Sequence, residues 1–266
     1  MKCSGHTNMT SLAQTLSALA PGVPCPIPAN WLQGRTAYGG LSAAIALHLV
    51  LQEAPEGLPP LKAAQVSFVG PVSNSARFNS EILRRGKSVT QIGVDARVGD
   101  ALAMRTSFIF GAQRTSKIRH VRTLRPDVQE PAAYLSLPST AVMPGHFPNF
   151  DVRFVGDNLP ISGSAVPELL AWVRLKDARG VRPEVALLAL GDCLPPASMA
   201  CFPEPAPISS MTWSVDFPQP AQSSNWYLQR SSSLAAADGY SLQLMEVWDE
   251  HGNLVLLGTQ TVAIFT

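Results

Sequence analysis

One pattern occurs twice in this chain. A Phe-x-x-Pro motif begins at Phe68 and again at Phe217, and a stretch rich in β-strand alternation follows each copy. Both copies end in a glycine turn and a last strand, with a threonine seven residues after the glycine. The two pairs are Gly99 with Thr106 and Gly252 with Thr259. A duplication constrains the fold, because two related halves that face each other form a cleft in which one half can keep chemistry that the other has lost.

Length and composition limit the possible classes of protein. The chain has 266 residues, which is enough for one large domain or two of about 130 residues each. Hydrophobic residues make up 46% of the sequence and charged residues only 15%, so the chain can bury a large core. The net charge of +1 gives no electrostatic reason to expect nucleic acid or an anionic membrane as the main partner.

The cysteines do not form a recognisable metal or redox motif. There is no Cys-x-x-Cys pair, and no histidine lies at metal-ligand spacing from the four cysteines, which are Cys3, Cys25, Cys193 and Cys201. We therefore expect no zinc site and no cofactor. A catalytic cysteine with a distant histidine stays open, although nothing local supports it. The low cysteine content fits a reducing compartment.

The N-terminal sequence lacks the charged and then apolar segments of a signal peptide. The longest apolar segment, residues 41–51, contains His48 and is too short to span a bilayer. These features predict a soluble, cytoplasmic protein without a membrane partner.

Hydrophobic periodicity predicts the same order of elements in each half. Residues 41–51 and 183–190 read as helices that are apolar nearly all round, and therefore buried. Alternation and turn signals predict an antiparallel meander after each helix. A buried helix wrapped by such a sheet is an α+β unit, and two units suggest two sheets joined edge to edge. The expected domains are residues 10–112 and 146–266, with a polar, proline-bearing linker at residues 113–145. Strands are expected at residues 65–69, 77–84, 89–98, 101–110, 150–155, 169–175, 210–217, 226–233, 240–248 and 254–265.

Asp192 stands at the end of the second predicted helix, just before Cys193 and two prolines. A carboxylate near a helix C-terminus opposes the helix dipole, so its presence suggests a function. The alternative interpretation is a local turn or cap residue.

Gln260 lies on the last predicted strand with the same parity as Leu256 and Val262, so an amide falls on an otherwise apolar face. Leu254 and Ile264 share this parity. A buried amide must find partners for its donors and its acceptor. The alternative is an amide at a sheet edge, satisfied by the backbone.

Ser210 opens the strand that follows the second helix and supplies a hydroxyl there. Its parity with Thr212 and Ser214 could instead place it on a solvent face. Applying the repeat spacing to the first half puts Ala43 opposite Asp192, Leu61 opposite Ser210 and Ser107 opposite Gln260. The first half would then lack the acid, the hydroxyl and the amide at the corresponding positions, which predicts one active site per chain.

Several stretches, taken together, resemble the acyl-CoA thioesterase II family, whose members have two fused hotdog folds. The resemblance covers residues 11–265. It is carried by residues 31–40 (WLQGRTAYGG), 68–71 (FVGP), 85–88 (RGKS), 210–217 (SMTWSVDF), 249–255 (DEHGNLV) and 259–260 (TQ), together with Asp192. It implies a double hotdog with one continuous sheet, a role in fatty acid metabolism and an acyl-CoA substrate, with a homodimer as a possible assembly.

The resemblance also implies a set of site residues. The family uses an Asp at the end of the second helix, a Thr opening the next strand and a Gln on the last strand, and these match Asp192, Ser210 and Gln260. Serine here replaces the family threonine but keeps the hydroxyl. The implied reaction is thioester hydrolysis, in which Asp192 activates or orients a water held by the other two side chains.

The helix entry at Tyr38, Gly39 and Gly40 is the expected place for substrate binding. Backbone N–H groups at a helix N-terminus can polarise a thioester carbonyl, and glycine allows close approach. The alternative, compatible interpretation is that the two glycines serve tight packing of helix on sheet.

Two further functions stay open at this point. A hydratase or dehydratase on a similar scaffold would use a His paired with an Asp. His48 is a candidate, but no Asp lies near it in sequence. A non-catalytic acyl-binding protein is the other alternative, for which the Thr-to-Ser difference is the only sequence indication.

Overall fold

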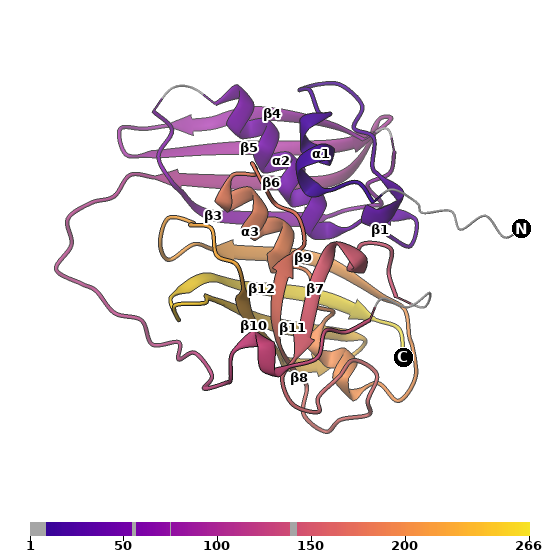
Figure 1. Ribbon diagram of the computed structural model, residues 1–266. Helices are drawn as coiled ribbons and strands as arrows, with labels where there is room; N and C mark the ends of the chain where they lie inside the picture. Colours follow the sequence, from indigo (N-terminus) through magenta and orange to yellow (C-terminus); the bar gives the residue numbers. More distant parts are fainter. Residues whose placement is uncertain (1–8, 55–56, 75, 139–142) are drawn as a thin grey trace, which may run out of the picture.

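A computed structural model describes residues 9–54, 57–74, 76–138 and 143–266. Its main feature is one ten-stranded antiparallel sheet with the strand order β4-β5-β6-β3-β9-β12-β11-β10-β8-β7. Helices α2 and α3 pack against each other and lie on the same face of this sheet (Figure 1). Helix α1 and a small two-stranded sheet, β1-β2, accompany the N-terminal half.

The two central helices and the ten strands of the main sheet follow the expected order, and the structure adds α1, the strands β1 and β2 and four short 3₁₀ turns. The helices are α1 (Leu12–Ser17), α2 (Gly39–Glu53) and α3 (Pro183–Gly191), with short 3₁₀ turns η1 (Ala29–Trp31), η2 (Pro131–Ala133), η3 (Phe147–Asn149) and η4 (Ala197–Cys201). The strands of the first half are β1 (Leu32–Gln33), β2 (Thr36–Ala37), β3 (Leu61–Phe68), β4 (Arg77–Arg85), β5 (Val89–Val98) and β6 (Ala101–Gly111). Those of the second half are β7 (Phe150–Phe154), β8 (Glu168–Leu175), β9 (Ile208–Asp216), β10 (Tyr227–Ala237), β11 (Tyr240–Asp249) and β12 (Leu254–Ile264).

Burial, rather than capping, stabilises the two central helices. Neither α2 nor α3 has a side-chain cap at its N-terminus. Instead, α2 is buried at nearly every position from Gly40 to Val50, and α3 from Val185 onward except at Ala186. Pro183 in the first turn of α3 has the backbone angle that starting a helix requires. The two helices predicted from the apolar runs are thus confirmed, with only small extensions at their ends.

The sheet is continuous because the two halves pair through β3 and β9. Gln65 lies opposite Ser214 at this junction, and these residues are 149 positions apart (214 − 65). The same offset separates Phe68 from Phe217. A residue that pairs with its own repeat counterpart lies on a local twofold axis, so the two hotdog units are related by a pseudo-twofold axis between β3 and β9. The prediction of an α+β double hotdog with one continuous sheet is confirmed.

Matching β-bulges show that the halves repeat in detail. A bulged residue adds one position to a strand and reverses the faces to which the following side chains point. In three pairs of strands the extra residue recurs at corresponding positions in both halves. These are Lys62 and Met211, Leu83 and Leu234, and Ala103 and Val255.

The segment between the halves covers the outer face of the second half of the sheet. Trp172, Leu228 and Trp248 form a buried cluster there, against which Val128 and Tyr134 of this segment pack. The Trp172 indole N–H donates to the Gln129 carbonyl oxygen (2.9 Å), and the Arg125 guanidinium lies over the Trp172 ring. Residues interpreted from sequence as a linker therefore complete a second apolar core. The exact domain boundaries stay a prediction.

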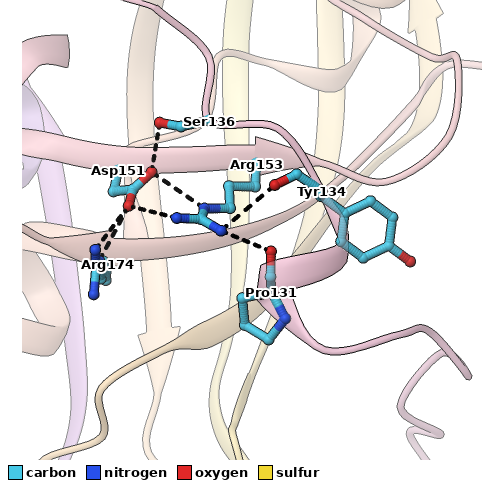
Figure 2. A network of polar contacts seen from close by, with 6 residues as sticks. All are labelled: Pro131, Tyr134, Ser136, Asp151, Arg153 and Arg174. Carbon is cyan, nitrogen blue, oxygen red and sulfur yellow. Dashed lines mark hydrogen bonds and ion pairs between the residues drawn. The ribbon is translucent and has the colours of Figure 1, made fainter.

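A buried carboxylate joins the same segment to the sheet edge (Figure 2). Asp151 on β7 is 6% exposed and pairs with Arg153 and with Arg174 of β8. It also accepts a hydrogen bond from the Ser136 hydroxyl (2.7 Å). Arg153 in turn donates to the Pro131 carbonyl oxygen (2.9 Å). Burial opposes the charge of Asp151, but these hydrogen bonds and charges outweigh it and hold its pKa below the ordinary value.

Within the described ranges, no helix has both the length and the apolar character needed to cross a bilayer.

Candidate active site

The site forms where the C-terminus of α3 meets the N-terminus of α2. Asp192 is the C-cap residue of α3, and its Oδ1 accepts a hydrogen bond of 2.6 Å from Nε2 of Gln260 on β12. The backbone N–H of Gly40 also donates to the Asp192 carboxylate. The structure thus brings together two residues that lie 68 positions apart in the chain.

The helix arrangement offsets the unfavourable position of Asp192 at the end of its own helix. The positive end of the α2 dipole, at Gly39 and Gly40, faces the carboxylate and favours its negative charge. A neighbouring helix therefore supplies the electrostatic compensation that α3 cannot.

The electrostatics of Asp192 are those of a carboxyl group that titrates near neutral pH. Removal from water raises its pKa from the ordinary 3.8 to about 7, although the Gln260 amide and the Gly40 N–H act in the opposite direction. The residue still keeps partial solvent access. A group with these properties can accept a proton from water and return it at physiological pH.

Two neighbouring titratable side chains stay protonated. Burial raises the pKa of Tyr38 and of Cys193 far above the ordinary values, and the nearby negative charge of Asp192 raises both further. Asp192 is therefore the group in this site that changes charge near pH 7.

A chain of side-chain amides continues behind Gln260. Gln243, directly opposite Gln260 on β11, donates through Nε2 to Gln260 Oε1 (3.3 Å). Gln243 Oε1 accepts from the backbone N–H of Ala197 (2.5 Å) in η4. Both glutamines are almost fully buried. Gln260 thus satisfies its amide through side chains in the interior, not through the backbone of a sheet edge.

Ser210 lies on the same face of the sheet as Gln260 because of a β-bulge. Met211 is the extra residue of β9, so Ser210 pairs with Val262 while Trp213 pairs with Gln260. Without the bulge, Ser210 would share the outer face with Thr212 and Ser214. Ser210 is half-buried, and among the described residues its hydroxyl makes no hydrogen bond. It is not bonded to the Asp192–Gln260 pair, and its part in the site stays a prediction.

Gly39 and Gly40 let the two helices approach closely. A Cβ on Gly39 would lie 2.7 Å from Asp192 Oδ2 and 3.1 Å from the ring of Phe68. A Cβ on Gly40 would lie 2.8 Å from the Ala189 carbonyl oxygen of α3. The packing interpretation of these glycines therefore has a direct steric basis. The substrate-binding role of Gly39 and Gly40 stays a prediction.

Tyr38 has a packing role in this structure. It is 1% exposed, its hydroxyl donates to the Ala189 carbonyl oxygen (2.9 Å), and its ring stacks on that of His146 (4.2 Å between centroids). Contact of Tyr38 with a substrate stays a prediction. Trp31, interpreted from sequence as structural, is fully buried beside it.

Register identifies the counterparts of the site in the first half, and two sequence assignments are wrong. Gln260 pairs with Trp213, and the corresponding pair is Phe108 with Ala64 (213 − 64 = 149). The counterpart of Gln260 is therefore Phe108, not Ser107, which faces the other side of the sheet. The turn between β11 and β12 is one residue longer than the turn between β5 and β6. Counting residues from the glycine of each turn therefore displaced the sequence alignment of the last strands by one position.

The counterpart of Asp192 is also displaced. Asp192 caps α3, whereas Ala43 lies in the first turns of α2, because α2 has 15 residues and α3 only 9. The C-cap of α2 is Ala54. Leu61 keeps its place as the counterpart of Ser210, since both precede the matching bulges at Lys62 and Met211. The three corresponding positions of the first half are thus Ala54, Leu61 and Phe108, all apolar.

A cavity of about 440 Å³ lies at the place in the first half that corresponds to the Asp192 site. Ala54 and Leu61 line it, together with Phe110, Phe217 and Arg182. It lies where the C-terminus of α2 meets the N-terminus of α3 and holds none of the three polar groups of the Asp192 site.

Sequence reasoning missed Gln243. A usable signal was present, because Gln243 has the parity of Met245 and Val247 on β11 and places an amide on an apolar face, as Gln260 does. The opposed pairing of the two glutamines was not visible, because it depends on the register between β11 and β12.

Comparisons with solved structures agree with the fold. The chain is similar to a conserved protein of unknown function with a hot dog fold from Alicyclobacillus acidocaldarius (TM-score 0.85, 22% identity, 96% of this chain and 98% of that chain covered). It is also similar to a putative thioesterase II from Thermobifida fusca YX (0.80, 17%, 97% and 99%) and to the acyl-CoA thioesterase II TesB2 from Mycobacterium marinum (0.72, 18%, 91% and 91%). A search of curated proteins found no match.

Family comparison covers both halves of the chain. Residues 27–111 match the acyl-CoA thioesterase N-terminal domain, and residues 123–264 match the acyl-CoA thioesterase C-terminal domain. The second match alone spans more than half of the sequence. The chain belongs to the acyl-CoA thioesterase family.

Proposed function

We propose that this protein hydrolyses acyl-CoA thioesters to a free acid and CoA, with Asp192 as the general base. The observation that carries the proposal is the environment of Asp192: the residue is only partly buried, burial raises the pKa of its carboxyl group to about 7, and the Gln260 amide nitrogen lies 2.6 Å from its Oδ1. Family membership supports thioester chemistry, and the residue pattern supports these particular groups.

In the proposed reaction, ionised Asp192 takes a proton from a water molecule as the water oxygen attacks the thioester carbonyl carbon. The tetrahedral intermediate then breaks its C–S bond, and Asp192 returns the proton to the departing thiolate. The balance is one water and one thioester consumed, one carboxylic acid and one thiol formed. A pKa near 7 suits both proton transfers, and the reaction needs no covalent acyl-enzyme.

The other polar groups have positioning roles in this proposal. The unpartnered Ser210 hydroxyl and the second N–H of Gln260 hold the water against Asp192. The N–H of Gly39, which has no acceptor among the described residues, polarises the thioester carbonyl at the positive end of α2. The Gly40 N–H is already engaged by Asp192, so only part of the expected helix entry is left for the substrate.

The hydratase alternative finds no support in the geometry. His48 bonds to Gln52 (3.0 Å), and His146 is buried against Tyr38. No histidine ring within the described ranges forms an ion pair with a carboxylate. A non-catalytic acyl-binding protein would have the same structure as the enzyme. The two alternatives differ only in whether the bound thioester is hydrolysed.

Thiol release tests the proposal directly. The substrates are acyl-CoAs of short, medium and long chain and one aromatic acyl-CoA, and the variants are Asp192→Asn and Asp177→Asn. Asp177 is a partly exposed aspartate paired with Arg179, so it controls for the loss of one carboxylate. We expect turnover in the wild type and in Asp177→Asn, and a loss of about 100-fold or more in Asp192→Asn. Equal turnover in the two variants would refute the role of Asp192.

A further inference from the structure

We propose that Gln243 is a positioning residue that fixes the direction in which the Gln260 amide faces Asp192. This inference rests on the proposed function of Asp192 and adds a residue that neither the family pattern nor the sequence analysis assigned. Gln243 makes its side-chain hydrogen bonds to Ala197 and Gln260 and none to Asp192, so it acts through Gln260.

The hydrogen bonds behind Asp192 run in one direction. A side-chain amide can turn around and exchange its donor and acceptor ends, but a backbone N–H can only donate. The Ala197 N–H therefore requires the oxygen of Gln243, at 2.5 Å. The remaining end of Gln243 is its NH₂ group, which donates to Gln260 Oε1. Gln260 must then present its own NH₂ group to Asp192.

The reverse orientation would be unfavourable at two contacts. A turned Gln260 would place its NH₂ group against that of Gln243 and its oxygen against the Asp192 carboxylate. Both glutamines are at most 2% exposed, and each polar group left without a partner in the interior is costly. The chain from Ala197 thus keeps a donor facing Asp192.

The fold itself does not require an amide at position 243. Gln243 lies opposite Gln260, and the corresponding pair in the first half is Ile92 opposite Phe108. Ile92 and Phe108 are both buried, so the same sheet position accepts apolar residues where there is no carboxylate to orient. An amide at this sheet position is therefore present only in the half that carries Asp192.

Gln229 provides a matched control on the neighbouring strand β10. It is fully buried, donates to the Gly191 carbonyl oxygen (2.8 Å) and accepts from the Cys193 thiol. Its counterpart in the first half, by register, is the apolar Phe78. Gln229 thus resembles Gln243 in residue type, burial and divergence between the halves, but it makes no hydrogen bond to Gln260.

The titration of Asp192 measures the orientation of the Gln260 amide. The groups that face Asp192 are Gln260 on β12, the N–H of Gly40 on α2, the Tyr38 hydroxyl and the Cys193 thiol. Tyr38 and Cys193 stay protonated, and His146 behind Tyr38 has a pKa lowered to about 4 by burial, so it is neutral near pH 7. Changes in titration near pH 7 therefore report on Asp192.

The experiment compares Gln243→Met with Gln229→Met in the full chain. The first readout is a ¹³C NMR titration of the Asp192 carboxyl, assigned by the signal missing in Asp192→Asn. The second is the acid limb of kcat/KM. When Gln243 no longer holds Gln260, we expect the Asp192 pKa to rise by about one unit, which lowers kcat/KM about tenfold at a pH below it. Gln229→Met should change both less than Gln243→Met does, because Gln229 bonds to the residues on either side of Asp192 and not to Gln260.

An unchanged Asp192 pKa in Gln243→Met, or an equal shift in Gln229→Met, would overturn the inference. If Gln243→Met does not fold, Gln243→Glu replaces it, because the glutamate is isosteric and puts an oxygen where the NH₂ group was. Its Asp192 pKa should rise as well, and no rise would again overturn the inference. The NMR titration needs no substrate, so an absence of turnover in the wild type would refute the proposed function while leaving the role of Gln243 testable.

Discussion

Phe108 and Gln260 occupy corresponding positions in the two halves of the sheet. Each lies on the helix-facing side, opposite residues of β3 and β9 that are 149 positions apart, and each is buried. One position is filled by an aromatic ring and the other by an amide bonded to Asp192. The symmetry of the backbone is therefore not accompanied by symmetry of the chemistry.

This asymmetry predicts one substrate site per chain. A non-hydrolysable acyl-CoA analogue, titrated into the protein by calorimetry, should bind with a stoichiometry of one. The cavity that corresponds to the Asp192 site is lined by Ala54 and Leu61 and lacks the carboxylate, hydroxyl and amide of that site. A stoichiometry of two would contradict the single-site arrangement.

Ser210 should contribute its hydroxyl and little else. Ser210→Ala removes the group proposed to hold the water, and we expect kcat to fall about tenfold while thermal stability changes little, because the residue is half-buried and makes no hydrogen bond. Ser210→Thr restores the family residue and should keep kcat within about twofold of the wild type. Steady-state kinetics of both variants test this, and equal losses in the two would show that the hydroxyl is not what matters.

Gly39→Ala should disturb the carboxylate directly. The new Cβ would lie 2.7 Å from Asp192 Oδ2, and Gln260 and Gly40 hold that carboxylate in place. We expect a fall in kcat of at least about tenfold, measured by thiol release, with a lowered Tm. Gly70→Ala is the matched control, because its Cβ would meet no atom closer than 3.8 Å. Full activity in Gly39→Ala would show that the contact can relax without consequence.

The raised pKa of Asp192 makes its ionisation a cost to stability. The folded-state pKa is about 7 and the unfolded value about 3.9, so the folded state binds the proton more tightly. The cost is absent below the unfolded pKa, grows as pH rises from about 4 to 7, and is constant above that. Asp192→Asn should therefore have a higher Tm than the wild type at pH 8 and a similar Tm at pH 4. Calorimetric scans at both pH values test this, and a lower Tm of the variant at pH 8 would contradict it.

Asp151 should behave in the opposite way. Its hydrogen bonds to Ser136, Arg153 and Arg174 hold its pKa below the ordinary value despite burial. The stability that it supplies is present above about pH 4 and is lost as the pH falls through the lowered folded pKa. Asp151→Ala should cost about 2 kcal/mol at pH 7, since the arginine partners are partly exposed and screened by water. Urea denaturation at pH 7 measures this, and a cost that persists undiminished at pH 2 would argue against an ionic origin.

Much of the fold follows from local pattern. The apolar runs at residues 41–51 and 183–190 predicted the two buried helices, and the alternating runs predicted every strand of the main sheet to within a few residues. The repeated Phe-x-x-Pro predicted the duplication, because local sequence preferences act alike in both copies. Asp192 and Gln260 were also identifiable, since a carboxylate at a helix C-terminus and an amide on an apolar strand face each oppose a local physical preference.

Tertiary structure alone decided how these residues meet. The bulge at Met211 moves Ser210 to the inner face, and the difference in turn and helix lengths replaces Ser107 and Ala43 with Phe108 and Ala54 as counterparts. The pairing of Gln243 with Gln260 depends on the register of β11 and β12. None of these can be read from the sequence, because one bulged residue reverses the face of every following side chain, and helix packing, not local preference, brings the N-terminus of α2 to Asp192.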